Sequence, residues 1–276
     1  MKRTSFVNLS VLRGLCFFVP LISTLAIAQQ SYLGFDRNDY PGDQYLKVLR
    51  QTFSYTGYWL NNPPGENSNS WIGKRQTLES AGFGFLVLFN GRLDKQLRHS
   101  AARLGKADGT TAVGAARREG FAERTIVFLD IEEGGRMLPE QKAYIYAWVD
   151  AVIADGFRAG VYCSGIPAQE DRNTSIVTAN DIRDNAHGRQ ITYWVTNDAC
   201  PPSPGCSFPN QPPVPAESKV EFAEVWQFAQ SPRTGFAAQC HNYNRDGNCY
   251  PPGISSASRV HIDVNAATSA DPSHGR

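Results

Sequence analysis

The sequence of 276 residues lacks the short motifs that mark several large protein classes. It has no heptad run, no Gly-rich phosphate loop and no dinucleotide-binding fingerprint, which argues against a coiled coil and a nucleotide-binding fold. Residues 160–165 (GVYCSG) lack the G-x-S-x-G spacing, so a serine hydrolase of that type is poorly supported. No internal repeat or linker divides the chain, which favours a single domain.

An excess of charge of one sign is also missing. Lys and Arg together number 27, Asp and Glu number 26, and no run of basic residues occurs. Nucleic acid or an anionic membrane surface would call for a basic patch, so neither is an expected partner.

Histidine is scarce as well. The five histidines show no ligand-like spacing such as H-x-H or H-E-x-x-H, so we expect neither a metal nor another cofactor. His261 lies two residues before Asp263 and would share its face of a strand. A metal-dependent hydrolase or phosphodiesterase therefore stays as an alternative.

The first residues are typical of a targeting segment. Lys2 and Arg3 precede an apolar run at residues 15–28, which is too short to span a bilayer comfortably, and residues 26–28 (AIA) fit a small-x-small cleavage pattern. We expect a signal peptide at 1–28 and a secreted or periplasmic protein without a membrane anchor after cleavage; a retained signal anchor is the alternative. Residues 29–276 would form one domain, with a core at about 31–265 and a polar C-terminal tail.

Five of the six cysteines follow this leader, and export permits disulfides. Cys200 and Cys206 close one short Pro-rich loop, and Cys240 and Cys249 close another that is rich in Asn and Gly. We expect those two pairings, although spacing alone does not determine connectivity. Cys163 lies within an apolar run, which favours a buried free thiol over a nucleophile.

Strand-like runs recur along the chain, at residues 31–37, 55–60, 83–90, 125–132, 158–164, 191–196, 224–229 and 260–265. Helical patterns follow the first five of these runs, and the third crossover contains Asp108-Gly109 before a helix through residues 112–116. Loops without a helix follow the sixth and seventh runs. This order predicts an α/β protein with a closed eight-stranded barrel.

Acidic residues converge at one rim of such a barrel. Asp36 ends the first strand, Asp130 and Glu132 end the fourth, and Asp263 lies near the end of the eighth. Side chains alternate along a strand, so Asp130 and Glu132 project from the same face with Cα atoms about 6.6 Å apart. Because active sites of these barrels lie at the C-terminal ends of the strands, we expect all four carboxyls at one mouth.

Aromatic and amide side chains occupy the late halves of several strands. Each alone is explained more simply as part of the core, but several around a ring of carboxylates form a surface on which sugar rings pack. The candidates for substrate contacts are Tyr58, Trp59, Tyr162, Trp194, Trp226 and Gln227, with Arg37 next to Asp36.

Cleavage of a glycosidic bond requires two carboxyl groups with different roles. One carboxylic acid protonates the leaving oxygen, and a second carboxylate stabilises the positive charge that develops on the sugar. Two carboxyls this close must differ in pKa, which provides one acid and one anion. Glu132 is our candidate for the acid and Asp130 for the anion.

Five motifs, GFDRN, FLDIEE, AGVYCS, VWQFA and HIDVN, occur in that order at the first, fourth, fifth, seventh and eighth strands. Over about residues 31–265 this order resembles the family-25 glycoside hydrolases, which are lysozyme-type muramidases, and more closely the related glycoside hydrolase-like domain DUF1906. The resemblance implies a modified TIM barrel of the (β/α)5(β)3 type. It also implies that Asp36, Asp130, Glu132 and Asp263 act in cleaving the β-1,4 bond after N-acetylmuramic acid.

Arg37 departs from the muramidase pattern, in which small residues follow the first aspartate. An arginine there could lower the pKa of Asp36 or contact a different group of the substrate. We expect a monomer whose partner is a polysaccharide, either peptidoglycan or another amino-sugar polymer. The main rival interpretation is a glycan-binding protein that keeps the barrel and the cleft without turnover.

Overall fold

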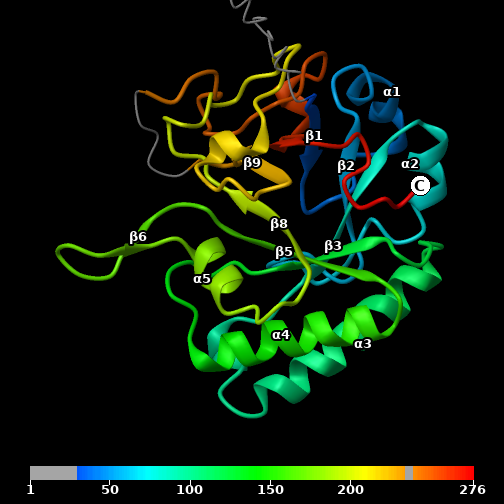
Figure 1. Ribbon diagram of the computed structural model, residues 1–276. Coiled ribbons are helices and arrows are strands. Elements are labelled where there is room, and N and C mark those ends of the chain that lie inside the picture. Colours follow the sequence, from blue (N-terminus) through cyan, green and yellow to red (C-terminus); the bar gives the residue numbers. More distant parts are fainter. Residues whose placement is uncertain (1–29, 234–238) are drawn as a thin grey trace, which may run out of the picture.

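The computed structural model describes residues 30–233 and 239–276. Its main feature is a barrel of eight strands: β1 (Tyr32–Asp36), β2 (Tyr55–Trp59), β3 (Gly84–Asn90), β4 (Ile126–Asp130), β5 (Arg158–Ser164), β8 (Ile191–Thr196), β9 (Val225–Ala229) and β10 (Asp263–Ala267). The strands close in the order β1–β10–β9–β8–β5–β4–β3–β2 (Figure 1). The predicted closed barrel is therefore confirmed.

Five α-helices follow the first five barrel strands: α1 (Leu46–Leu49), α2 (Arg75–Ser80), α3 (Ala101–Arg118), α4 (Pro139–Ala154) and α5 (Thr178–Asp184). After β8 and β9 the described chain forms loops with only the short 3-10 helices Pro215–Ser218 and Ser256–Ser258. This is the (β/α)5(β)3 arrangement that the resemblance implied. None of the helices in the described ranges is long and apolar enough to cross a membrane.

Helix α3 begins earlier than the sequence pattern indicated. The pair Asp108-Gly109 lies inside it, because Gly105 and Gly109 face α4 and let the two helices approach closely. A Cβ atom at Gly105 would lie 2.2 Å from the carbonyl oxygen of Tyr144. In Figure 1 α3 and α4 lie side by side along the lower face of the barrel.

The last strand begins later than predicted, and the structure shows in which direction it runs. It begins at Asp263, three residues after the predicted start, and it runs antiparallel to both β1 and β9. Asp263 is consequently the first residue of its strand. Because the strand runs in the opposite direction to its neighbours, Asp263 still lies at the end of the barrel where the parallel strands finish, and it pairs with Asp36.

A small hairpin, β6 (Ala168–Gln169) and β7 (Ser175–Ile176), is an addition that the sequence did not predict. It projects from the body between β5 and α5 (Figure 1). Strands of two residues are too short to produce an alternating pattern in the sequence.

The segment after β10 packs under the barrel although it was predicted to be a polar tail. Ser273 is fully buried, its backbone pairs with Phe85 and Ile126, and its hydroxyl accepts a hydrogen bond from the backbone N–H of Val87 at 2.8 Å. The carboxylate of Asp271 accepts from the Phe85 N–H at 2.8 Å. These residues satisfy the backbone groups at the start of β3 and β4.

The predicted disulfide pairing is wrong, although the four cysteines are the expected ones. The bonds are Cys200–Cys240 and Cys206–Cys249, so they join the loop after β8 to the loop after β9. Both loops leave neighbouring parallel strands at the same end of the barrel, which places them next to each other. Cys163 is free and buried, as expected.

Candidate active site

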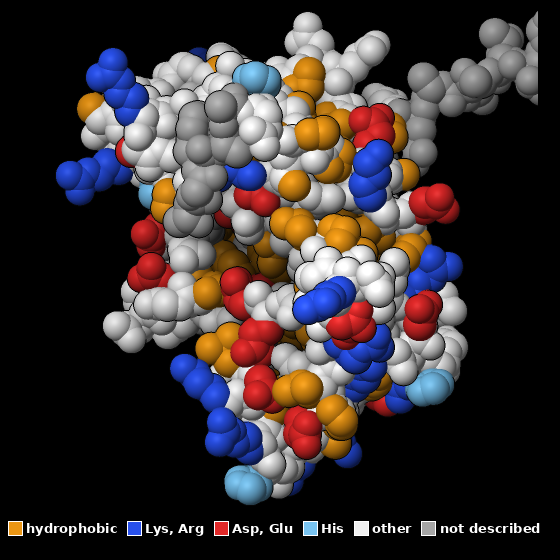
Figure 2. Space-filling view, turned by 90° about the vertical axis from the view of Figure 1, so that its left-hand side faces the viewer, with side chains coloured by type: hydrophobic (Ala, Val, Ile, Leu, Met, Phe, Trp, Pro, Cys, Tyr) orange, Lys and Arg blue, Asp and Glu red, His pale blue; other side chains and the backbone are white. Residues whose placement is uncertain are grey.

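A cavity of about 230 Å³ lies at the mouth of the barrel, and all four predicted carboxyls line it. The other lining residues are Asn38, Trp59, Pro64, Leu88, Tyr162, Trp194, Gln227, Gln230 and Ser231. Figure 2 shows the side of the molecule on which β6 projects in Figure 1. That face is hollowed, with hydrophobic side chains at depth and acidic side chains near the edge. The structure therefore brings together residues from distant parts of the sequence.

Strand ends place the four acids at different depths. Asp36 and Asp130 are the last residues of β1 and β4, and they are 6% and 3% exposed. Glu132 follows β4 by two residues and is exposed at the rim. Asp263 faces Asp36 across the β1–β10 pair. The pair on β4 thus consists of one buried and one accessible carboxyl.

The barrel makes room for Asp36 by means of a glycine in the neighbouring strand. A Cβ atom at Gly57 of β2 would lie 2.8 Å from the Cβ atom of Asp36. Any larger residue would displace the carboxyl, so the glycine in the motif YTGYW is explained by this close approach.

A chain of amide side chains holds Asp36 in place. Its Oδ1 atom accepts hydrogen bonds from Asn265 at 2.7 Å and from Gln227 at 3.0 Å. The indole N–H of Trp194 donates to Asn265 Oδ1 at 2.9 Å, and the Tyr162 hydroxyl donates to Gln227 Oε1 at 2.7 Å. Each amide is fixed by a donor behind it, so the carboxyl and two aromatic residues form one rigid network.

Desolvation raises the pKa of three of the four carboxyls. The pKa of Asp36 rises to about 6, because the cost of desolvation exceeds the stabilising effect of its two hydrogen bonds. Burial and the charge of Glu132 raise the pKa of Asp130 well above its usual range. Burial and the charge of Asp36 do the same to the pKa of Asp263, against a 2.6 Å hydrogen bond from the Ser231 N–H.

Asp130 is the least satisfied of these acids. No hydrogen-bond donor in the described chain reaches either carboxyl oxygen, and both oxygens are buried. Only the Glu132 carboxyl comes within hydrogen-bonding range, so the two groups can bond only through a shared proton. We expected the proton on Glu132 and the charge on Asp130. The raised pKa of Asp130 means that this carboxyl holds a proton to a higher pH than an isolated aspartate, and the two assigned roles stay predictions.

The predicted aromatic residues separate into two groups. Tyr162 and Trp194 line the cavity with ring centroids 4.5 Å apart, and Trp59 lines it too. Tyr58 and Trp226 lie away from it. The Tyr58 hydroxyl bonds the Glu119 carboxylate on the helical side of the barrel, and the Trp226 indole donates to the Asn197 carbonyl at 2.9 Å. The residues next to Tyr58 and Trp226 along their strands, Trp59 and Gln227, line the cavity. Because side chains alternate along a strand, Tyr58 and Trp226 point to the opposite face.

Arg37 lies beside the cavity and does not line it. Its carbonyl oxygen accepts from the Trp59 indole at 3.1 Å, and its guanidinium interacts electrostatically with Asp39 and Asp263. Of the two roles considered for Arg37, lowering the pKa of Asp36 does not prevail, since burial raises that pKa. Contact with another group of the substrate stays a prediction.

Four polar residues of the site were not predicted: Asn38, Asn265, Gln230 and Ser231. Asn265 could have been found, since it lies two residues after Asp263 and must share its face of the strand. Gln230 and Ser231 follow the end of β9, where strand alternation stops. Gln230 donates to the Tyr162 hydroxyl at 3.1 Å.

The loop that carries Glu132 is held on both sides. Thr178 of α5 accepts from the Gly135 N–H at 2.8 Å and donates to its carbonyl at 3.0 Å. On the other side the Glu133 carboxylate accepts from the Asp94 N–H and from Gln141 of α4, both at 2.8 Å. Glu132 is therefore positioned by a loop that two helices fix.

Two further features bear on where the chemistry lies. In residues 30–233 and 239–276 no cluster of three or more His, Cys, Asp or Glu has an arrangement that could hold a metal ion.

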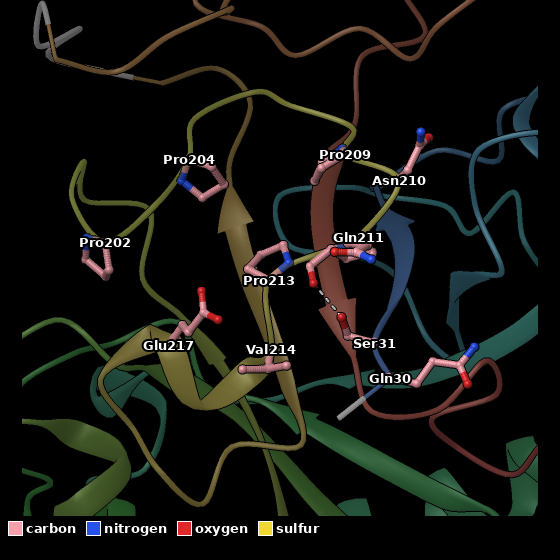
Figure 3. Close-up of a pocket in the computed structure, with 11 residues that line it drawn as sticks. Gln30, Ser31, Pro202, Pro204, Pro209, Asn210, Gln211, Pro213, Val214 and Glu217 are labelled. Carbon is pink, nitrogen blue, oxygen red and sulfur yellow. Dashed lines mark hydrogen bonds between the residues drawn. The ribbon is translucent and has the colours of Figure 1, made fainter. Parts of the chain in front are cut away.

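A larger hollow of about 980 Å³ lies between the loop after β8 and the start of β1 (Figure 3). It is lined mostly by proline and amide side chains, and its single acid is Glu217. No set of converging carboxyls is present there.

The fold is shared with proteins of known structure. An uncharacterized protein of B. stearothermophilus is 20% identical and superposes with a TM-score of 0.54 over 86% of this chain and 95% of that chain. The Tat-secreted protein Rv2525c of Mycobacterium tuberculosis is 12% identical, with a TM-score of 0.51 over 90% of this chain and 98% of that chain. At these identities the similarity concerns the fold. No curated protein matches the chain.

A family model, the Rv2525c-like glycoside hydrolase-like domain, matches residues 55–210, which include Asp130 and Glu132. The resemblance carried by the five short motifs is thereby confirmed at the level of the family. With its closed barrel and five covering helices, the chain belongs to the family of Rv2525c-like glycoside hydrolase-like domains.

Proposed function

We propose that this protein is an exported glycoside hydrolase that cleaves peptidoglycan or a related amino-sugar polymer. The observation that carries the proposal is the cavity at the barrel mouth, in which a buried and an accessible carboxyl lie two residues apart beside two further acids. A site that only binds neutral sugars has no need of this arrangement, because burying several acids together is costly. The resemblance to muramidases motivates the choice of substrate.

The proposed reaction uses the two carboxyls of the β4 end as one unit. The proton that Asp130 and Glu132 share reaches the glycosidic oxygen through Glu132, which is the accessible member. As the C–O bond breaks, the leaving sugar gains a hydroxyl group, and the pair becomes fully charged next to the positive anomeric carbon. Addition of water to that carbon then returns one proton to the pair.

The remaining residues orient the sugar. Tyr162, Trp194 and Trp59 offer aromatic surface within the cavity, and Gln227 and Asn265 fix Asp36 through direct hydrogen bonds. Asp36 and Asp263 face the β4 pair across the mouth, where they add to the negative field that stabilises a developing positive charge.

Export is supported by the two disulfides, because such bonds persist in oxidising compartments. The expected signal peptide at 1–28 lies outside the described residues, so its cleavage stays a prediction. A secreted or periplasmic location would place the protein in contact with a polysaccharide partner.

The proposal is tested by measuring release of reducing ends from purified peptidoglycan by the wild type and Glu132→Gln. The variant is expected to lose at least about a hundredfold in rate, the loss typical of removing a general acid. Glu140→Gln is the control, since Glu140 is exposed at the start of α4 and outside the cavity. Absence of cleavage by the folded wild type, with binding to the polymer retained, would leave a glycan-binding protein instead.

A further inference from the structure

The cavity at the barrel mouth is lined by four carboxyl side chains and, among the described residues, by no lysine, arginine or histidine. Its volume of about 230 Å³ is below the range of about 300–1,000 Å³ that is typical for drug-sized ligands. A single small unit therefore fits within it, and that unit would be surrounded by acids.

Asp130 is the buried acid of this cavity to which the described protein donates no hydrogen bond. The side chain is 3% exposed, lines the cavity, and has both oxygens without a hydrogen-bond donor. Asp36 and Asp263 each accept at least one hydrogen bond from the protein. A ligand that brings donors to Asp130 would satisfy a group that the protein itself leaves unsatisfied.

The nearest cationic side chains do not neutralise the cavity. Arg37 interacts electrostatically with Asp263 but does not line the cavity. Burial, and after it the charge of Arg37, lowers the pKa of His261, which favours the neutral imidazole. Arg233 is engaged in an ion pair with Asp198 at 2.6 Å. The amides and aromatic rings that complete the lining carry no charge. The cavity is consequently net negative whenever its acids ionise.

We propose that this cavity binds a hexosamine unit whose amino group is free and cationic, in preference to the N-acetylated unit, and that it rejects a sugar bearing a free carboxylate. An ammonium group brings three donors and a positive charge to Asp130 and its neighbours, whereas an acetamido group brings one N–H and no charge. This inference rests on the proposed function and narrows its substrate to polymers that contain de-N-acetylated hexosamine.

The test compares binding of the tetramers of glucosamine and N-acetylglucosamine by calorimetry at pH 7, with glucuronic acid as the anionic probe. The wild type is expected to bind the glucosamine tetramer at least tenfold more tightly than the acetylated one, and to bind glucuronic acid below detection. Raising the salt concentration should narrow the difference, because charge–charge attraction is screened. Asp130→Asn should reduce the preference severalfold, whereas Glu140→Gln should keep it.

The wild-type preference does not depend on any variant folding. Equal or tighter binding of the acetylated tetramer, or binding of neither tetramer, overturns the inference. Cleavage of both polymers without preference also overturns it and leaves the proposed function standing. A clear preference for the glucosamine tetramer, with no cleavage of any amino-sugar polymer, supports the inference and overturns the proposed function.

Discussion

The carboxyl of Asp36 is buried and accepts two hydrogen bonds that favour its charged form. Burial has the larger effect on its pKa. The Oδ1 atom accepts from Asn265 and Gln227, but the pKa rises from an ordinary 3.8 to about 6. The folded protein therefore holds the proton more tightly than the unfolded chain does. Stability linked to this group is fully present below about pH 4 and is lost as the pH rises through about 6.

Asp36→Asn is expected to remove this pH dependence. The amide oxygen of asparagine can still accept both hydrogen bonds, so the variant and the wild type should have similar unfolding free energies near pH 4. Near pH 8 the variant should be more stable by up to about 3 kcal/mol, since each pKa unit corresponds to about 1.4 kcal/mol. Urea unfolding at both pH values measures this, and a difference that does not change with pH would contradict it.

The pKa of Asp130 is shifted in the same direction as that of Asp36, and this bears on how the site is expected to titrate. Burial and the charge of Glu132 raise the pKa of Asp130, so the shared proton persists to a higher pH than an isolated aspartate would allow. The proposed reaction needs that proton, and hydrolysis should fall at the pH where the pair loses it.

At the scale of elements, the site depends on helices that lie outside the barrel. Gln141 of α4 holds Glu133, and Thr178 of α5 holds Gly135, so the loop with Glu132 is fixed from both sides. Helix α4 is itself positioned by α3 through the glycine contacts at residues 105 and 109. A change in the α3–α4 contact is therefore transmitted to the loop at the barrel mouth.

Two alanine substitutions in α3 separate packing from helix propensity. In Gly105→Ala the new Cβ atom would lie 2.2 Å from the Tyr144 carbonyl oxygen, so α4 must shift, and we expect a loss of about 1–3 kcal/mol. In Gly114→Ala the nearest atom is Arg118 Nη1 at 3.5 Å, and we expect a gain of about 0.5–1 kcal/mol because glycine disfavours helices. Chemical denaturation measures both. Changes of the same sign would argue against the close helix contact.

At the scale of the whole molecule, three consecutive strands lack covering helices, and loops take their place. The loops after β8 and β9 are joined by two disulfides, which constrain segments of 40 and 43 residues. The segment after β10 fills the opposite end of the barrel, where Ser273 pairs with β3 and β4. The four acids therefore lie at one end of the barrel, and the segment after β10 fills the other end.

The arrangement of strands and helices could be predicted because most elements carry a strong local pattern. The run IVFLD of β4 is buried throughout, and α4 has Pro139 in its first turn and Gly156 after its end. Direction and pairing could not be predicted in the same way. The antiparallel course of β10 and the disulfide connections depend on contacts between distant segments, which local spacing does not encode.

For the site, the predicted strand ends were sufficient to place Asp36, Asp130 and Glu132 at one mouth, whereas Asp263 lies there as the first residue of an antiparallel strand. Strand alternation predicted which residues share a face. It did not separate Trp194, which lines the cavity, from Trp226, which faces away, because the register of a strand is set by its neighbours. The raised pKa of Asp130 follows from its burial, and burial is a property of the assembled barrel.

The most direct test of a hydrolytic site is hydrolysis of a de-N-acetylated and a fully acetylated amino-sugar polymer in oxygen-18 water, followed by mass spectrometry of the fragments. We expect new reducing ends that carry one oxygen-18 atom at the anomeric carbon, formed by the wild type and nearly abolished in Glu132→Gln. Fragments that end in anhydro sugars without the label, or no fragments from either polymer, would contradict the assignment of this carboxyl ring as a hydrolytic site.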